Sequence, residues 1–334
     1  MYELKDTKNR YAEFCRSENL PLFMQPWWLD IVAANNWSVA LIEEKGHVVA
    51  AHPYLYSRKM GFRIIHQPEF TQHLGPWVTA DFKNSKKYLS RKKRALQGLI
   101  DQLPEHDIYS QFWHYSEEYW LPFYWRGFQQ STRYTYRIKS LESEEKIWLN
   151  LHENIRREIR KAEKRFKLSI DVDASIDDLI HVVDLTFKRQ KASLPFSRES
   201  FRRIDEKLAK IGKRKIFIAR DEQDRIHAGL FLVWDESCAY YLIGGGDPLL
   251  RNSGAMSLCM WEALKFSSRV SRSFDFEGSM IEEIEGYFRA FGAELTPYFA
   301  VARSSSQIVS LAMAGLKKNK KLKNMALKWL VSIR

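Results

Sequence analysis

The most constraining feature of this 334-residue chain is segment 240–292, in which strand, glycine, helix, strand and helix signals follow one another. Residues 240–243 form a β-branched and aromatic run that is typical of a strand. Three glycines at 244–246 and Asp247-Pro248 predict a turn. A mostly apolar helix pattern comes next, and residues 274–279 then bring two carboxylates to the end of a second strand. This order predicts an α/β unit in which a helix begins beside acidic residues.

The start of that helix is predicted to bind an anion. Either Asn252 or Ser253 is placed to cap it, which leaves the following amide groups without intrahelical partners. Such amides, with a basic side chain beside them, attract negative charge, although an ordinary helix start has the same pattern. The predicted donor-binding residues here are Arg251, Asn252, Ser253, Gly254 and Ala255.

Asp275 and Glu277 are the predicted catalytic residues. They are two positions apart, so on a strand they share a face. Acyl transfer to an amine needs a group that accepts the amine's proton. We assign this role to Glu277 and amine binding or a structural role to Asp275. The reverse order, or Asp275 as a cap of the next turn or the partner of an arginine, is the alternative.

Four pieces of this segment carry a family resemblance when they occur in one order. They are Ile243-Gly244, Trp261-Glu262, residues 275–279 and residues 288–292. Together they resemble the Fem family of peptidoglycan-bridge aminoacyltransferases and the related FemAB-like (BioF2-type) acyltransferases of the GNAT superfamily. Weaker likeness at 25–28 and near Arg157 extends the resemblance over most of the chain. It implies an α/β (α+β) fold of tandem GNAT-like domains, each a mixed, mostly antiparallel sheet flanked by helices.

The resemblance also implies a reaction. An acyl or aminoacyl group would move from acyl-CoA (acetyl-CoA) or aminoacyl-tRNA to an amine of a cell-envelope or polysaccharide precursor. The implied partners are a nucleotide- or lipid-linked amino sugar as acceptor and, for the second donor, tRNA.

Further site residues follow from the resemblance. Phe288 and Arg289 are similar to the Phe-Lys pair with which Fem-like enzymes hold the donor, although Arg289 also fits an ordinary surface position. The implied acceptor-binding residues are Arg157, Arg160, Arg189 and Gln190. For the first two the alternative is a solvated helix face, and for the last two a loop between helices.

Two departures favour a different function. The GNAT pyrophosphate signature has Gly or Ala where this chain has Met256. The tyrosine that often acts as general acid in GNAT enzymes is replaced by Phe288, and Tyr287 faces about 100° away on a helix. The second hypothesis is therefore a non-catalytic GNAT-like module that binds RNA or an anionic membrane.

The domain organisation is predicted from an internal similarity. Residues 38–57 and 215–234 each read as strand, charged turn and strand, which suggests two copies of one unit. The predicted domains are 1–140 and 141–305, followed by a basic amphipathic helix at 306–334. An amphipathic helix is also predicted over 143–166, because apolar residues recur there every three or four positions.

Charge is concentrated at the C-terminal end. Eight of the basic residues that produce the net charge of +12 lie between Val301 and Arg334, where no acid occurs. A basic amphipathic helix of this kind is suited to an anionic membrane surface, RNA or a polyanionic precursor, and the alternative is that one face simply covers its own domain. Three cysteines and nine histidines show no metal-ligand spacing, so no metal is predicted. The expected location is cytoplasmic, with peripheral contact at the inner face of the membrane through this helix.

Overall fold

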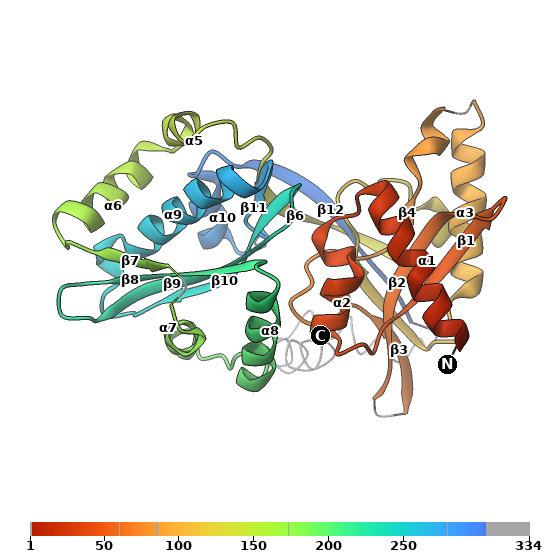
Figure 1. The fold of residues 1–334 in the computed structure, drawn as a ribbon, viewed down its shortest axis with the longest axis horizontal. Helices are drawn as coiled ribbons and strands as arrows, with labels where there is room; N and C mark the ends of the chain where they lie inside the picture. Colours follow the sequence, from red (N-terminus) through yellow and green to blue (C-terminus); the bar gives the residue numbers. More distant parts are fainter. Residues whose placement is uncertain (1, 60, 85, 173, 279, 305–334) are drawn as a thin grey trace. The chain divides into compact units, whose positions relative to one another are not determined.

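The computed structural model describes residues 2–59, 61–84, 86–172, 174–278 and 280–304 (Figure 1). The chain divides into two compact units. The N-terminal unit comprises the described residues of Met1–Arg133 and of Pro297–Arg334, and the C-terminal unit comprises those of Tyr134–Thr296. The predicted helix at 306–334 lies outside the described residues. The predicted domain boundary near Leu141 stays a prediction, and the structural division falls within strand β6.

The N-terminal unit is a mixed sheet with helices. Its strands run in the order β1-β2-β3-β5-β12, with β4 paired to β2. Strands β3 and β5 are parallel, and the other pairs are antiparallel. The elements are α1 (Tyr2–Glu18), η1 (Leu22–Met24), α2 (Pro26–Val32), β1 (Ser38–Glu44), β2 (His47–Lys59), β3 (Phe62–His66), β4 (Trp77–Val78), η2 (Ala80–Asn84), α3 (Tyr88–Gln102), β5 (Ile108–Phe112), α4 (Leu121–Tyr124) and β12 (Glu294–Ser304).

The predicted strand pair at 38–57 is confirmed as the hairpin of β1 and β2. Lys45 and Gly46 form its turn, with φ angles of 52° and 82°. Positive φ at both central residues gives a two-residue turn whose twist matches that of the flanking strands. A glycine at the second position adopts this conformation without strain.

The C-terminal unit has strand order β6-β11-β10-β9-β8-β7. Strands β10 and β11 pair in parallel, and the pairs β6–β11, β9–β10, β8–β9 and β7–β8 are antiparallel. Helix α9 packs on one face of this sheet with α5 and α6 against it, and α7 with α8 covers the other face (Figure 1). The elements are β6 (Gln129–Ile138), α5 (Glu144–Asn150), α6 (Glu153–Lys164), β7 (Ser169–Val172), α7 (Ile176–Arg189), α8 (Arg198–Lys210), β8 (Arg214–Arg220), β9 (Ile226–Trp234), β10 (Cys238–Gly246), η3 (Arg251–Ser253), α9 (Ala255–Val270), β11 (Ser273–Asp275) and α10 (Glu282–Arg289).

Two local predictions for the C-terminal unit were wrong. The predicted helix over 143–166 is two helices, because Leu151 is extended and the His152 amide donates to the Ala290 carbonyl at 2.8 Å. The predicted glycine turn at 244–246 is the end of strand β10. A Cβ at Gly245 would lie 2.6 Å from the Val182 carbonyl oxygen, so the glycine lets α7 approach the strand closely.

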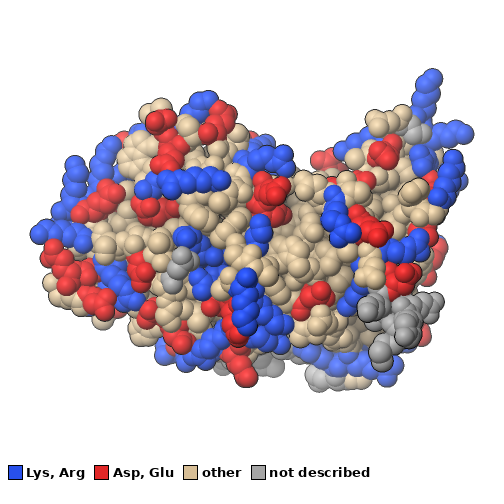
Figure 2. All heavy atoms as spheres, in the orientation of Figure 1, with Lys and Arg blue, Asp and Glu red and all other residues tan. Residues whose placement is uncertain are grey.

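Charges are mixed on the face shown in Figure 2, where Lys and Arg side chains are interspersed with Asp and Glu over most of the surface. Among the described residues, no helix is long and apolar enough to cross a membrane.

Candidate functional site

The parallel strands β10 and β11 diverge at one end. They are paired only where Cys238–Tyr240 meets Ser273–Asp275, and β10 continues to Gly246 after β11 has ended. The register between β10 and β9 also shifts between Tyr241 and Ile243. Ligands of α/β sheets bind outside the carboxyl ends of parallel strands, beside the point where the strand order reverses. We therefore take the ends of these two strands as the candidate site.

Aromatic side chains pack together where the strands diverge. The ring of Phe288, from α10, lies 6.0 Å from that of Tyr241 and 5.2 Å from that of Phe276, between ring centroids. Tyr241 belongs to β10 and Phe276 directly follows β11, so Phe288 contacts both strand ends. The predicted donor-binding residue Phe288 is thus a buried part of this packing.

Helix α9 begins differently from the prediction. Gly254, at φ 80°, occupies the N-cap position, instead of Asn252 or Ser253, and no side chain caps the helix in the usual way. The Ser253 hydroxyl accepts a hydrogen bond from the Ala255 amide at 3.4 Å. A Cβ at Gly254 would lie 2.3 Å from the Glu158 carbonyl oxygen of α6. The close approach of α6 therefore requires a glycine here.

The predicted donor-binding residues at this helix start differ in exposure. Ser253, Gly254 and Ala255 are buried, whereas Arg251 and Asn252 are exposed. Most residues in the first turn of α9 are buried, and Met256 is half-buried. Their assignment stays a prediction.

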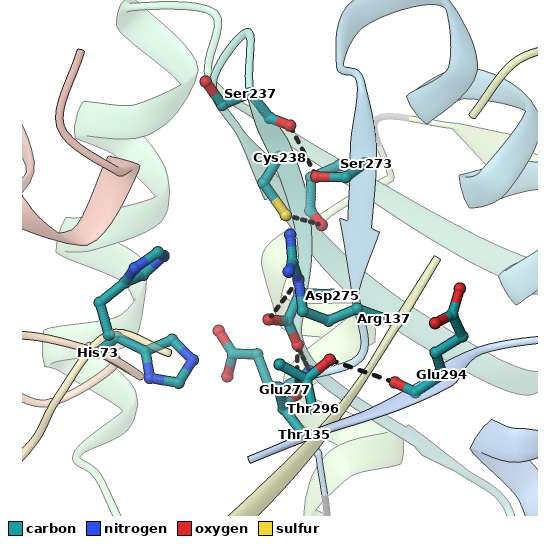
Figure 3. A network of polar contacts seen from close by, with 12 residues as sticks. His73, Thr135, Arg137, Ser237, Cys238, Ser273, Asp275, Glu277, Glu294 and Thr296 are labelled. Carbon is teal, nitrogen blue, oxygen red and sulfur yellow. Dashed lines mark hydrogen bonds and ion pairs between the residues drawn. The ribbon is translucent and has the colours of Figure 1, made fainter. Parts of the chain in front are cut away.

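The Asp275 carboxylate is the centre of a buried polar network (Figure 3). It accepts hydrogen bonds from the Thr135 hydroxyl and, at 2.8 Å, from the Glu277 amide. The Arg137 guanidinium lies 3.8 Å away. Burial raises the pKa of Asp275 to about 6, against the lowering effect of Thr135, Arg137 and the Glu277 amide. The carboxyl therefore changes its charge close to neutral pH.

Glu277 follows the strand in a tight turn. It does not share a strand face with Asp275 as predicted, since β11 ends at Asp275 and Glu277 adopts φ 54°. Gly278 follows at φ 56°, and a Cβ there would lie 2.4 Å from the Tyr134 carbonyl oxygen. A non-glycine residue in this conformation is strained, and such strain is often found at functional sites. The Asp275 carboxylate holds the turn, and the Glu277 side chain leads away from it (Figure 3).

Tyr287, which the sequence argument set aside because it faces away from Phe288 on a helix, lies next to the aromatic cluster. The Tyr287 hydroxyl lies 3.3 Å from the Ser257 hydroxyl, in the first turn of α9. Burial raises the pKa of Tyr287 well above its ordinary value, so this hydroxyl stays protonated at neutral pH. Its direction could not be read from helical spacing alone, because the partner comes from another helix.

Arg289 is paired on the surface. Its guanidinium contacts the Glu285 carboxylate at 2.9 Å, and that carboxylate also accepts a hydrogen bond from the Tyr136 hydroxyl at 2.5 Å. The guanidinium would have to leave Glu285 to hold a donor with its full charge. Its donor-binding role stays a prediction.

Thr135 and Arg137 are further residues that sequence reasoning missed. Their signal was present in the sequence, because residues two apart on a strand such as β6 share a face. The partner that gives them a role, Asp275, is far along the chain.

The predicted acceptor-binding residues lie in two places. Arg157 and Arg160 lie on either side of Glu158 in the sequence of α6, and both are exposed. Helix α6 packs against η3 and α9. Arg160 also pairs with Glu153 at 3.5 Å. Arg189 ends α7 and Gln190 follows it, and both are exposed. These assignments stay predictions.

Among the described residues, no group of three or more His, Cys, Asp or Glu side chains could hold a metal ion. The site is therefore built from carboxylates, hydroxyls and aromatic rings.

Comparison with known proteins identifies the class of this unit. Residues 150–287 match the family described as acetyltransferase (GNAT) domain. This segment, which contains β10, α9 and β11, is therefore a GNAT-type acetyltransferase domain. No curated protein matches the sequence.

Solved structures show the same fold over nearly the whole chain. FemX aligns with a TM-score of 0.65 at 12% identity, over 88% of this chain and 95% of that chain. L-PGS from Bacillus licheniformis aligns with a TM-score of 0.56 at 11% identity, over 92% and 95%. A tandem GNAT protein from the clavulanic acid biosynthesis pathway aligns with a TM-score of 0.51 at 10% identity, over 90% and 96%. The predicted tandem GNAT fold and its likeness to Fem proteins are confirmed.

Proposed function

We propose that this protein is an N-acyltransferase that moves an acyl or aminoacyl group to an amine at the ends of β10 and β11. The observation that carries the proposal is the strained turn after β11, in which buried Asp275 fixes the backbone of Glu277. The GNAT-type domain at 150–287 supports acyl transfer as the reaction class. A carboxylate held on a rigid turn at the end of a strand is suited to repeated proton transfer.

The proposed chemistry has three parts. The Glu277 carboxylate accepts a proton from the ammonium of the acceptor. The neutral amine that results then attacks the donor carbonyl. A C–N bond forms and the C–S bond of a thioester or the C–O bond of an ester breaks. The Tyr287 hydroxyl, held beside Ser257, gives a proton to the leaving thiolate or alkoxide, and the second proton lost by the attacking nitrogen returns Tyr287 to its neutral form. Asp275 is a positioning residue, because it acts through the Glu277 amide.

The donor is either an acyl-CoA, which GNAT domains use, or an aminoacyl-tRNA, as the likeness to FemX suggests. The aromatic packing bears on this choice. A pantetheine chain inserted between the strand ends would displace the Phe288 ring from Tyr241 and Phe276. An aminoacyl ester presented from outside the strands would leave these rings in place.

The acceptor is proposed to be the amine of a nucleotide- or lipid-linked amino-sugar precursor of the cell envelope. The exposed arginines of α6 support this class, because guanidinium groups bind phosphate in a bidentate manner. The proposed path brings the phosphate of the precursor to Arg157 and its amine to Glu277.

Single-turnover transfer tests the proposal. The full chain is incubated with radiolabelled acetyl-CoA or with an aminoacyl-tRNA pool, and with UDP-glucosamine as the amine acceptor. We expect transfer by the wild type, a loss of about 100-fold or more in Glu277→Gln, and little change in the matched exposed variant Glu283→Gln. Equal rates in the wild type and Glu277→Gln would remove Glu277 from the mechanism. No transfer from either donor would overturn the proposed function.

A further inference from the structure

A cavity in the N-terminal unit is not used by the chemistry above. Its volume is about 540 Å³, which is within the range of small-molecule sites. It is lined by the end of α1, by β4 and η2, by the first turns of α3 and by the loop at 116–119. The lining residues that matter here are Glu18, Trp77, Tyr88, Lys92, Glu117 and Tyr119.

A buried ion pair forms one wall. The Lys92 ammonium lies 2.8 Å from Glu117 Oε1, and both side chains are more than nine-tenths buried. The Tyr119 amide donates to the same oxygen at 2.8 Å. In the described part of the chain both contacts go to Oε1, and Oε2 is not among the buried oxygens that lack a partner, so Oε2 is open to the cavity. Burial raises the pKa of the Glu117 carboxyl, although Lys92 opposes this effect.

Solvent in the cavity can reach this oxygen, so a ligand there can replace that solvent as its hydrogen-bond partner. Most of the Glu117 side chain is buried, so the position of the oxygen is fixed by the surrounding protein. The oxygen is an acceptor only, so its natural partner is a donor, above all a charged N–H group.

The remaining charges of the cavity favour a cation. Glu18 accepts hydrogen bonds from the Thr79 hydroxyl and the Ala80 amide, and no cation pairs with it or with Glu118 in the described part of the chain. Three carboxylates and two ammonium groups line the cavity, and one ammonium, that of Lys92, is already paired. The rings of Trp77, Tyr88 and Tyr119 add aromatic surface, which attracts organic cations.

We propose that this cavity binds a small organic molecule through a protonated amine. The ammonium donates to Glu117 Oε2, and the body of the ligand lies against the aromatic rings. The site belongs to the N-terminal unit alone and does not depend on the acyl-transfer proposal.

Matched pairs of probes test the role of the amine. Binding of glucosamine and glucose, and of 1,5-diaminopentane and 1,5-pentanediol, is measured by calorimetry with the full chain at neutral pH. Within each pair only the charged amine differs. We expect the amine of at least one pair to bind about tenfold more tightly or better than its neutral partner, as the loss of a charged hydrogen bond implies.

Variants locate the binding. Glu117→Gln is expected to lose about ten- to hundredfold in amine affinity. Glu13→Gln, at an exposed residue of α1 that does not line the cavity, is the control with less than about a threefold change. Because Glu117→Gln leaves Lys92 buried without its carboxylate, Trp77→Ala serves as a second variant, with folding checked by circular dichroism. It is expected to weaken amine binding about tenfold.

Three results would overturn the proposal. They are no binding of either amine, equal binding of amines and neutral partners, and unchanged amine affinity in folded Glu117→Gln or Trp77→Ala. Tighter binding of phosphate than of the amines would assign the cavity to anions and would equally overturn it.

Discussion

Replacement of Asp275 by Asn tests the buried carboxylate that holds the candidate site. The pKa of Asp275 is about 6 in the folded protein, against an ordinary value of 3.8. At about 1.4 kcal/mol per unit of pKa difference, the need to ionise this group in the folded protein lowers the free energy of unfolding at pH 7 by about 3 kcal/mol. Because the folded protein holds the proton more tightly, the stability from this group is complete below pH 3.8 and is lost as the pH rises through 6.

The assay is urea unfolding of the full chain and of Asp275→Asn at several pH values. The asparagine side chain can still accept from the Glu277 amide but does not ionise. The free energy of unfolding of the variant minus that of the wild type should therefore rise by about 2 kcal/mol between about pH 4 and pH 7.5. Thr135→Val removes a hydroxyl that favours the ionised carboxylate. The free energy of unfolding of Thr135→Val minus that of the wild type should therefore fall over the same pH range.

The refuting result is a difference between Asp275→Asn and the wild type that stays constant with pH. It would mean that the carboxylate has the same proton affinity in the folded and unfolded chains. The contacts of Thr135, Arg137 and the Glu277 amide would then offset the whole effect of burial on the pKa of Asp275.

Three further substitutions test the packing around the site. Gly278→Ala should destabilise the protein by more than about 3 kcal/mol in urea unfolding, because the new Cβ meets the Tyr134 carbonyl oxygen at positive φ. The control Gly286→Ala has open space around it and should change the free energy of unfolding by less than about 1 kcal/mol. Similar values for both variants would contradict the strained turn. Phe288→Ala should cost about 3–5 kcal/mol in the same assay through the cavity that it leaves, and a cost below about 1 kcal/mol would show that the ring is not packed between the strand ends. Ser175→Ala removes the hydroxyl that accepts from the Asp177 amide at the start of α7 and should cost about 1 kcal/mol, whereas no loss would mean that water satisfies that amide equally well.

The strands were predictable because their signals are local. The charged turns at Lys45-Gly46 and between β8 and β9, and the apolar runs beside them, identify both hairpins from a few adjacent residues. The class of the C-terminal unit was predictable because several motifs of one family lie in one order within residues 240–292.

The details that the sequence argument missed depend on partners far along the chain. Helix α6 starts at Glu153 because the His152 amide bonds to Ala290, and Thr135 matters because it donates to Asp275. The pair of Lys92 and Glu117 is likewise invisible in a linear pattern, since a helix and a loop bring its members together. The basic C-terminal segment lies outside the described residues, so the RNA- or membrane-binding hypothesis stays a prediction.

The last strand has a consequence for synthesis of the protein. Strand β12 begins at Glu294 in the C-terminal unit and continues to Ser304, where it pairs with β5 of the N-terminal unit and buries Val301. The N-terminal unit therefore lacks one of its own strands until the residues up to Ser304 have been translated. During that interval β5 has an open edge, so we expect the nascent chain to depend on chaperones and a fragment that ends at Thr296 to aggregate.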